Sequence, residues 1–149
     1  MILTTRLSFF LLAVSVCCSC NNQTGEPKTQ PGKASAFNCY NYINKKDTVI
    51  LKTILVGGFI TGTLVYNFYE KDKSQGTIQG QMKGDLLIAD YTFNSEGIQS
   101  KRQIAFKKMG DKFIEGYGEA EDRNGKMAFK NLDSLNFDHT TILNKVDCK

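Results

Sequence analysis

The segment KGDLLIADYTFN, residues 83–94, joins a turn to an extended strand. Gly84 and Asp85 are residue types that two-residue hairpin turns favour, because glycine adopts a positive φ without steric penalty. The following LLIADYTFN is rich in the branched and aromatic side chains that are typical of strands. This segment therefore predicts a hairpin turn followed by a β-strand.

The same unit recurs at a fixed spacing along the chain. Its turn glycines are Gly58, Gly84 and Gly110, and both intervals are the same, since 84 − 58 = 26 and 110 − 84 = 26. In the last two copies a Gly-Asp pair precedes a large apolar residue, Leu87 or Phe113. A fixed period with a turn at each interval indicates one repeated hairpin unit, stacked side by side.

The body of the chain reads as strand after strand. From residue 37 onward proline is absent and aromatic and β-branched residues are dense. We expect eight strands, at residues 37–43, 48–56, 59–70, 76–83, 86–94, 98–108, 112–120 and 126–132. The tail, residues 133–147, is expected to form a short helix or a last strand.

An antiparallel meander of this length must protect its edges, and closing into a barrel is the common solution. We therefore predict an all-β, up-and-down meander of about eight strands in a closed or strongly rolled barrel. The expected architecture is similar to that of the lipocalins, although no lipocalin motif is present. A β-sandwich is the structural alternative.

The two ends of such a meander differ in their connections. One end would carry the tight turns, at Gly57–Gly58, Gly84–Asp85 and Gly110–Asp111. The other end would carry the longer charged loops, at residues 44–47, 70–76, 94–97 and 121–126. Because loops on a rigid scaffold often carry function, we expect the charged end to be the recognition surface. Solvated loop charges without a partner are the alternative.

The N-terminus has the features of an export signal. Met1–Arg6 carries one basic side chain, and LSFFLLAVSV, residues 7–16, is apolar but far shorter than the roughly 20 residues that span a bilayer. CCSC, residues 17–20, follows directly. Residues 21–36 contain both prolines and few apolar side chains, as a solvated tether does.

The segment that ends at Cys20 resembles the lipobox of bacterial lipoproteins, in which a small residue precedes a cysteine that is acylated and becomes the mature N-terminus. Ser19 is the small residue, Cys20 is the expected lipidation site, and Cys18 is the alternative. The chain departs from the family pattern at Cys17, where leucine is usual. The resemblance implies a signal peptide at 1–19, a lipidated cysteine and tether at 20–36, and a separate barrel domain at 37–149.

The resemblance also implies a membrane attachment. In this family an Asp after the lipidated cysteine favours inner-membrane retention, whereas Asn21 and Asn22 stand here. We therefore expect an outer-membrane lipoprotein. An acidic run that would mark surface export is absent directly after Cys20, so the periplasmic face is favoured over the cell surface.

The two remaining cysteines, Cys39 and Cys148, lie at the two ends of the expected barrel. In an oxidising compartment this pair predicts a disulfide. Two buried free thiols are the alternative.

Catalytic, metal and nucleic-acid sites are not expected. His139 is the single histidine, and Asp138 and Ser134 beside it lack the Gly-x-Ser-x-Gly context of a nucleophile. The net charge of +4 is spread among interleaved acids and bases, without the basic stripe that follows a phosphate backbone. We predict a non-enzymatic protein with no cofactor, no metal and no nucleic-acid partner.

A binding interior is the remaining expectation. Tyr66, Tyr91 and Tyr117 recur at nearly the same phase of the hairpin period, and Arg102 shares a strand face with Ile104. A small barrel either fills itself with side chains or holds one ligand. Aromatic side chains with a single cation suit an apolar molecule bearing an acid group. The alternative is that the aromatic residues form the core and Arg102 reaches out at a strand end.

Two function classes follow. The first is a lipid-anchored barrel that binds a small apolar or amphiphilic ligand, and the second is a lipid-anchored module that binds an envelope protein, as an inhibitor or an assembly factor. An internal cavity would favour the first, and a filled core beside an exposed apolar patch the second. Thr48 and Ser134 each follow an Asp and precede an apolar residue, a pattern that resembles bacterial O-glycosylation sites.

Overall fold

The computed structural model describes residues 37–138 and 141–148, so the expected signal peptide, Cys20 and the tether lie outside the described residues. Among the described residues there is no helix long and apolar enough to cross a membrane. The structure contains ten strands: β1 (Asn38–Asn44), β2 (Asp47–Val56), β3 (Phe59–Asn67), β4 (Ser74–Lys83), β5 (Leu86–Ser95), β6 (Ile98–Met109), β7 (Lys112–Gly116), β8 (Ala120–Asp122), β9 (Met127–Phe129) and β10 (Ile142–Val146).

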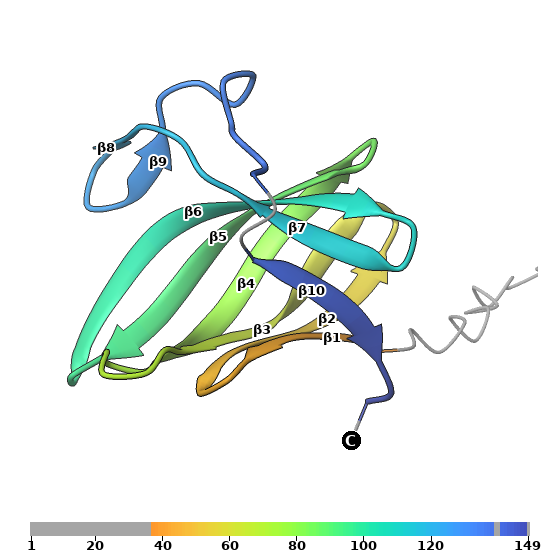
Figure 1. Ribbon diagram of the computed structural model, residues 1–149. Coiled ribbons are helices and arrows are strands. Elements are labelled where there is room, and N and C mark those ends of the chain that lie inside the picture. The colour runs from red at the N-terminus through yellow and green to blue at the C-terminus, as the bar shows by residue number, and fades with distance from the viewer. Residues whose placement is uncertain (1–36, 139–140, 149) are drawn as a thin grey trace, which may run out of the picture. The chain divides into compact units, whose positions relative to one another are not determined.

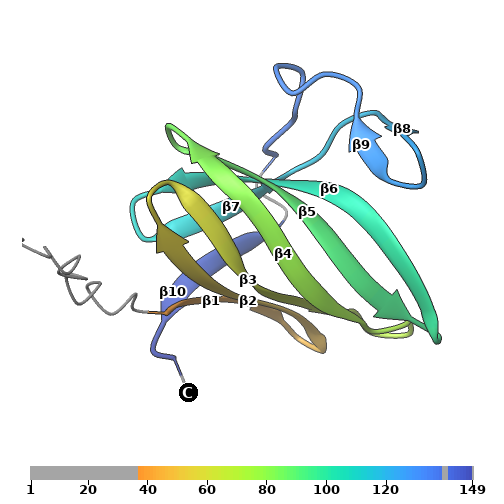
Figure 2. The same ribbon diagram turned by 180° about the vertical axis from the view of Figure 1, so that it is seen from behind.

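Eight of these strands close into an antiparallel barrel. Their order is β5, β4, β3, β2, β1, β10, β7 and β6. The barrel closes because β6 pairs with β5 along the whole length of β5, from Leu86↔Lys107 to Ser95↔Ile98. Figures 1 and 2 show the rolled sheet from its two sides. Closure pairs every barrel strand on both sides, which removes the exposed edges. The predicted up-and-down barrel is thus confirmed, and the alternative, a β-sandwich, is not the observed fold.

The eighth barrel strand is not the one that the sequence predicted. The expected strand at 112–120 ends at Gly116, and the expected strand at 126–132 shortens to β9, outside the barrel. The tail instead supplies the eighth strand, since β10 inserts between β1 and β7 through the pairs Cys39↔Val146 and Leu143↔Phe113.

The chain leaves the barrel after Gly116 because a returning segment packs against that residue. A Cβ atom on Gly116 would lie 2.5 Å from the ring of Phe137, so a larger residue there would force this ring to shift. Tyr117 then bridges Asn136. The sequence predicted that the charged loop 121–126 would lie at the charged end of the barrel. This prediction was wrong, because the loop belongs to the β8–β9 hairpin.

The β8–β9 hairpin is fastened to the outside of the barrel wall, beside β6 (Figure 1). Lys126 Nζ lies 2.9 Å from Asp90 Oδ1 on β5, and Lys101 Nζ lies 3.3 Å from Asp90 Oδ2. The backbone N–H of Phe129 donates a 3.1 Å hydrogen bond to Gln103 Oε1. These polar contacts fasten the hairpin to the outer side of the barrel wall.

Alternation along the strands fills the barrel interior. Large side chains that are essentially inaccessible include Tyr91, Phe106, Leu51, Leu64, Ile78, Leu87, Leu143 and Val49. Where neighbouring strands approach most closely, the wall uses glycine: a Cβ on Gly76 would lie 1.9 Å from the carbonyl oxygen of Thr92, and one on Gly80 would lie 2.1 Å from that of Ile88. Such close backbone approach is what glycine in a strand permits.

The two barrel ends differ in their turns. The glycine end comprises the turns at 57–58, 84–85 and 110–111, which place Gly57, Gly58, Gly84 and Gly110 at positive φ. The loop end comprises the connections at 45–46, 68–73 and 96–97, where Lys45, Glu70 and Glu96 adopt positive φ although they carry side chains. Left-handed backbone costs roughly 1 to 2 kcal/mol for such residues. The loop end therefore keeps charged side chains at strained positions.

A disulfide joins the first and last strands of the barrel region. Cys39 in β1 and Cys148 just after β10 are bonded, with their Cα atoms 5.3 Å apart. This confirms the predicted pairing. The bond closes the chain around the whole domain, because the two cysteines are 109 positions apart.

Candidate binding site inside the barrel

Arg102 lies on the inward face of β6, and its guanidinium is surrounded by aromatic rings. The Cζ atom is 5.0 Å from the ring centroid of Tyr66, 5.6 Å from that of Tyr91 and 5.5 Å from that of Phe93. These rings come from β3 and β5, which flank the interior near the loop end. Ring faces attract a cation within about 6 Å, so three aromatic side chains stabilise one charge.

One hydrogen-bond donor of Arg102 has no acceptor among the described residues. Its Nε atom is buried and has no hydrogen-bond acceptor, and among the described residues no carboxylate lies within 4.0 Å of its guanidinium. A guanidinium carries five N–H donors, and a buried donor without an acceptor costs about 1 to 3 kcal/mol. Arg102 therefore has no direct ion pair with a carboxylate among the described residues.

A buried carboxylate, Glu115 on β7, lies in the same part of the interior. It is 6% exposed and accepts a hydrogen bond from the hydroxyl of Tyr66 at 2.5 Å and one from Tyr117 at 2.9 Å. Since the Tyr117 hydroxyl has one proton and gives it to Glu115, the 3.0 Å contact with Thr141 Oγ1 is donated by Thr141. Burial raises the pKa of Glu115, although both hydrogen bonds and the positive charge of Arg102 lower it in part.

The tyrosines of the cluster are positioned by packing and by their own hydroxyls. Tyr91 donates a 3.0 Å hydrogen bond to the carbonyl oxygen of Leu64, and its ring stacks on that of Phe93 with centroids 4.7 Å apart. Tyr66 meets Tyr91 edge to face at 5.9 Å. Burial raises the pKa of both phenols, and for Tyr66 the negative charge of Glu115 adds to the effect.

The structure brings the four predicted residues into one cluster. Tyr66, Tyr91 and Arg102 lie inside the barrel, and Tyr117, just past the end of β7, reaches Glu115 with its hydroxyl. Sequence reasoning did not include Glu115 or Thr141. The alternation of KFIEG indicated that Glu115 shares the face of Phe113, but a lone glutamate in a short strand resembles a surface residue.

The centre of the barrel is occupied by side chains. Tyr91, Phe106, Leu51 and Leu64 are less than 2% exposed and leave the middle of the core closed. Above them at the loop end, Tyr42, Phe68 and Phe93 are only partly buried. The partly exposed side of the aromatic cluster therefore lies at the loop end, and the middle of the barrel has no room for a ligand.

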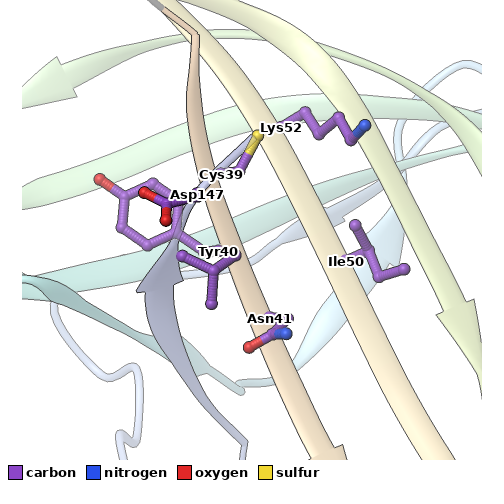
Figure 3. A pocket seen from close by; sticks show the side chains of 7 residues that line it. Cys39, Tyr40, Asn41, Ile50, Lys52 and Asp147 are labelled. Atoms are coloured by element: carbon purple, nitrogen blue, oxygen red, sulfur yellow. The ribbon is translucent and has the colours of Figure 1, made fainter. Parts of the chain in front are cut away.

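Two concave regions lie elsewhere. A groove of about 570 Å³ on the outer wall is lined by Cys39 and Asn41 of β1 and by Ile50 and Lys52 of β2 (Figure 3). A cup of about 300 Å³ at the glycine end has Tyr40 among its lining residues. Arg102 lines neither of them.

Comparison with protein families, with curated proteins and with solved structures finds no match for this chain. Among the described residues no group of three or more His, Cys, Asp or Glu side chains is placed to hold a metal ion. The candidate site is therefore defined by its own geometry. The guanidinium of Arg102 faces three aromatic rings, has no ion pair with a carboxylate among the described residues, and lies in the same part of the interior as the buried carboxyl of Glu115.

The two predicted glycosylation sites fall in different surroundings. Thr48 lies in β2, is partly buried and pairs with Asn67, whereas Ser134 lies in an exposed turn and donates a 3.1 Å hydrogen bond to the carbonyl oxygen of Asn131. Glycosylation at either residue stays a prediction.

Proposed function

We propose that this protein is a lipid-anchored barrel of the cell envelope, attached through Cys20 to the periplasmic face of the outer membrane. Its role is to bind a small amphiphile that carries an acidic group, without catalysis. The observation that carries the proposal is the guanidinium of Arg102, which faces three aromatic rings and has no carboxylate within 4.0 Å among the described residues.

An anionic ligand group supplies what Arg102 lacks. A carboxylate or phosphate accepts two parallel N–H bonds from a guanidinium, which orients the ligand as well as neutralising the charge. The partly buried rings of Tyr42, Phe68 and Phe93 offer an apolar surface next to that charge. An acid head on Arg102 with a short hydrocarbon segment on the rings uses both features.

Binding is tested with dodecanoate and, for comparison, dodecanol, which has the same chain length but no charge. We expect saturable binding of dodecanoate with a clear preference over dodecanol, and a loss of that preference in Arg102→Met. Lys101→Met is the matched control, because Lys101 lies on the same strand but pairs with Asp90 on the outer wall. Equal binding of both probes by the wild-type protein contradicts the proposal.

Attachment through Cys20 is tested separately by cell fractionation. The apolar run at 7–16 and the small residue Ser19 before Cys20 support acylation. Two or more acyl chains hold a protein on a membrane nearly irreversibly, at about 0.8 kcal/mol per buried methylene. The native protein should fractionate with membranes, whereas residues 21–149, exported behind a cleavable signal peptide without a lipobox, should be soluble, and a soluble native protein refutes the anchor.

A second candidate function, binding of an envelope protein, is favoured by the filled core and by the β8–β9 hairpin that projects from the wall (Figure 2). Glu121, Asp122 and Arg123 on this hairpin are exposed. A photo-crosslinker at Arg123 should form one discrete adduct in intact cells if a protein binds there. Absence of an adduct, together with dodecanoate binding, decides for the small ligand.

A further inference from the structure

The β2–β3 hairpin at the glycine end exposes a short apolar tip. Leu55, Val56 and Phe59 surround the turn at Gly57 and Gly58, with Val56 62% and Phe59 66% exposed. These side chains follow one another around a single turn, unlike the scattered apolar residues that every protein surface carries. A contiguous exposed apolar patch marks an interaction surface.

The surroundings of this tip are basic. The glycine end carries five lysines and three aspartates around its rim, a balance of 5 − 3 = +2, namely Lys83, Lys107, Lys108, Lys112 and Lys145 against Asp85, Asp111 and Asp147. Lys83 and Asp85 flank the β4–β5 turn, which neighbours the tip because the N–H of Met82 donates to the carbonyl oxygen of Gly58 at 3.0 Å. Exposed apolar side chains next to a rim with more lysines than aspartates complement an anionic membrane, in which charged headgroups cover an apolar interior.

The path of the chain brings the same end toward the proposed anchor. β1 begins at the glycine end, where Asn38 pairs with Thr53, and Phe37 before it is exposed. Cys20 precedes Phe37 by 37 − 20 = 17 residues. A segment of that length reaches at most about 60 Å even when fully extended. A barrel anchored at Cys20 thus stays within about that distance of the bilayer, and its described residues begin at the glycine end.

We infer that the glycine end docks on an anionic lipid surface, with Leu55, Val56 and Phe59 inserted among the headgroups and the surrounding lysines next to the phosphates. Amphipathic elements bind membranes in this way, through apolar insertion together with attraction to anionic lipid. Docking turns the loop end, and with it Arg102, away from the membrane and toward the aqueous compartment. This orientation rests on the proposed anchor, whereas the docking surface does not.

The test uses residues 21–149, which lack both the apolar run at 7–16 and Cys20, so binding reports the surface of the barrel region without the signal peptide or an acyl chain. In co-sedimentation with vesicles of phosphatidylethanolamine and phosphatidylglycerol we expect binding that weakens in about 1 M salt, where the Debye length is about 3 Å. Phosphatidylcholine vesicles should bind much less. Phe59→Asp should weaken binding by about tenfold or more, since it removes apolar insertion and adds a negative charge.

Ile43→Asp and Ile98→Asp are the matched controls. Both residues are exposed to the same degree as Phe59, at 67% and 68%, but lie at the loop end. They should leave vesicle binding unchanged, and circular dichroism should show the same β-spectrum for all variants. Equal loss of binding in Phe59→Asp and Ile98→Asp overturns the docking surface.

Two further outcomes also overturn it. One is that residues 21–149 do not bind anionic vesicles at all, a result that leaves the acyl anchor standing if the native protein still fractionates with membranes. The other is that sedimentation shows a dimer that Phe59→Asp dissociates, in which case a second copy of the chain covers the tip.

Discussion

The hydroxyl of Tyr66 donates a 2.5 Å hydrogen bond to the carboxylate of Glu115, which lies 49 residues further along the chain. The bond crosses the barrel interior from β3 to β7. The guanidinium of Arg102, which is partly buried, lies 5.0 Å from the centre of the same tyrosine ring, so an acid, a phenol and a cation form one polar cluster near the loop end. Polar groups in such a core are stabilising only when each is satisfied, and Arg102 is the member that is not.

Stability should depend on pH through Glu115. Burial raises the pKa of this carboxyl above its ordinary value of 4.5, so the folded state holds the proton at pH values where the unfolded chain has released it. Stability should therefore fall as pH rises from about 4.5 through the raised folded pKa. In Glu115→Gln this decline should be absent. Thermal melts of both proteins across that pH range measure it, and parallel curves would show that Glu115 does not titrate in the fold.

The disulfide should contribute strongly to stability. It closes a loop of about 110 residues, for which the chain-entropy model gives about 4 to 5 kcal/mol. We expect Cys39→Ala with Cys148→Ala to lower the free energy of unfolding by about 2 to 5 kcal/mol in urea titrations. The wild-type protein under reducing conditions is the control. An unchanged urea midpoint in both cases argues that the strand pairs of β10 alone hold the barrel closed.

Gly76 should not tolerate a side chain. A Cβ atom there would lie 1.9 Å from the carbonyl oxygen of Thr92 on the paired strand, so Gly76→Ala must push β4 and β5 apart. We expect a loss of about 2 to 4 kcal/mol, in the range of strained backbone and core substitutions. The exposed neighbour Thr77→Ala should cost less than about 0.5 kcal/mol. Urea midpoints that fall by the same amount in both variants would contradict the close approach.

The attachment of the β8–β9 hairpin should depend on Asp90. Burial acts to raise its pKa, but hydrogen bonds from Lys126 and Lys101 and their charges hold the pKa below the ordinary value. The stability that these pairs supply is present above pH 4 and is lost as pH falls through the lowered pKa, and for partly exposed pairs it is at most about 1 kcal/mol.

Asp90→Asn should therefore speed amide exchange locally. Hydrogen exchange in β8 and β9 should accelerate, while exchange in the barrel strands stays as it was. A slowing or a uniform change across all strands would show that the hairpin is held by other contacts.

The barrel could be predicted from the sequence because its signals are local. The turns around Gly58, Gly84 and Gly110 and the alternation in residues 86–94 each specify a hairpin without reference to the rest of the chain. The closing of the sheet into a barrel could be predicted because an open antiparallel sheet would leave the backbone groups of its edge strands unpaired. The disulfide followed from the positions of Cys39 and Cys148 at the two ends.

The identity of the eighth strand could not be predicted, because it depends on a contact between distant residues. The segment after Gly116 has the composition of a strand, but in the fold Phe137 packs on Gly116 and Tyr117 bridges Asn136 where the chain leaves the wall. Glu115 was missed for a similar reason. Its two tyrosine partners lie 49 residues before it and two residues after it, and only the closed barrel brings Tyr66 to it.

The central claim is that Arg102 holds the acidic group of a small amphiphile. Native mass spectrometry of the protein released from the envelope tests it most directly, with non-reducing peptide mapping to confirm the Cys39–Cys148 bond in the same sample. If Arg102 binds the ligand, we expect a bound species of a few hundred daltons that is retained in Lys101→Met and lost in Arg102→Met. A wild-type protein that carries no adduct and takes up no added dodecanoate would contradict it.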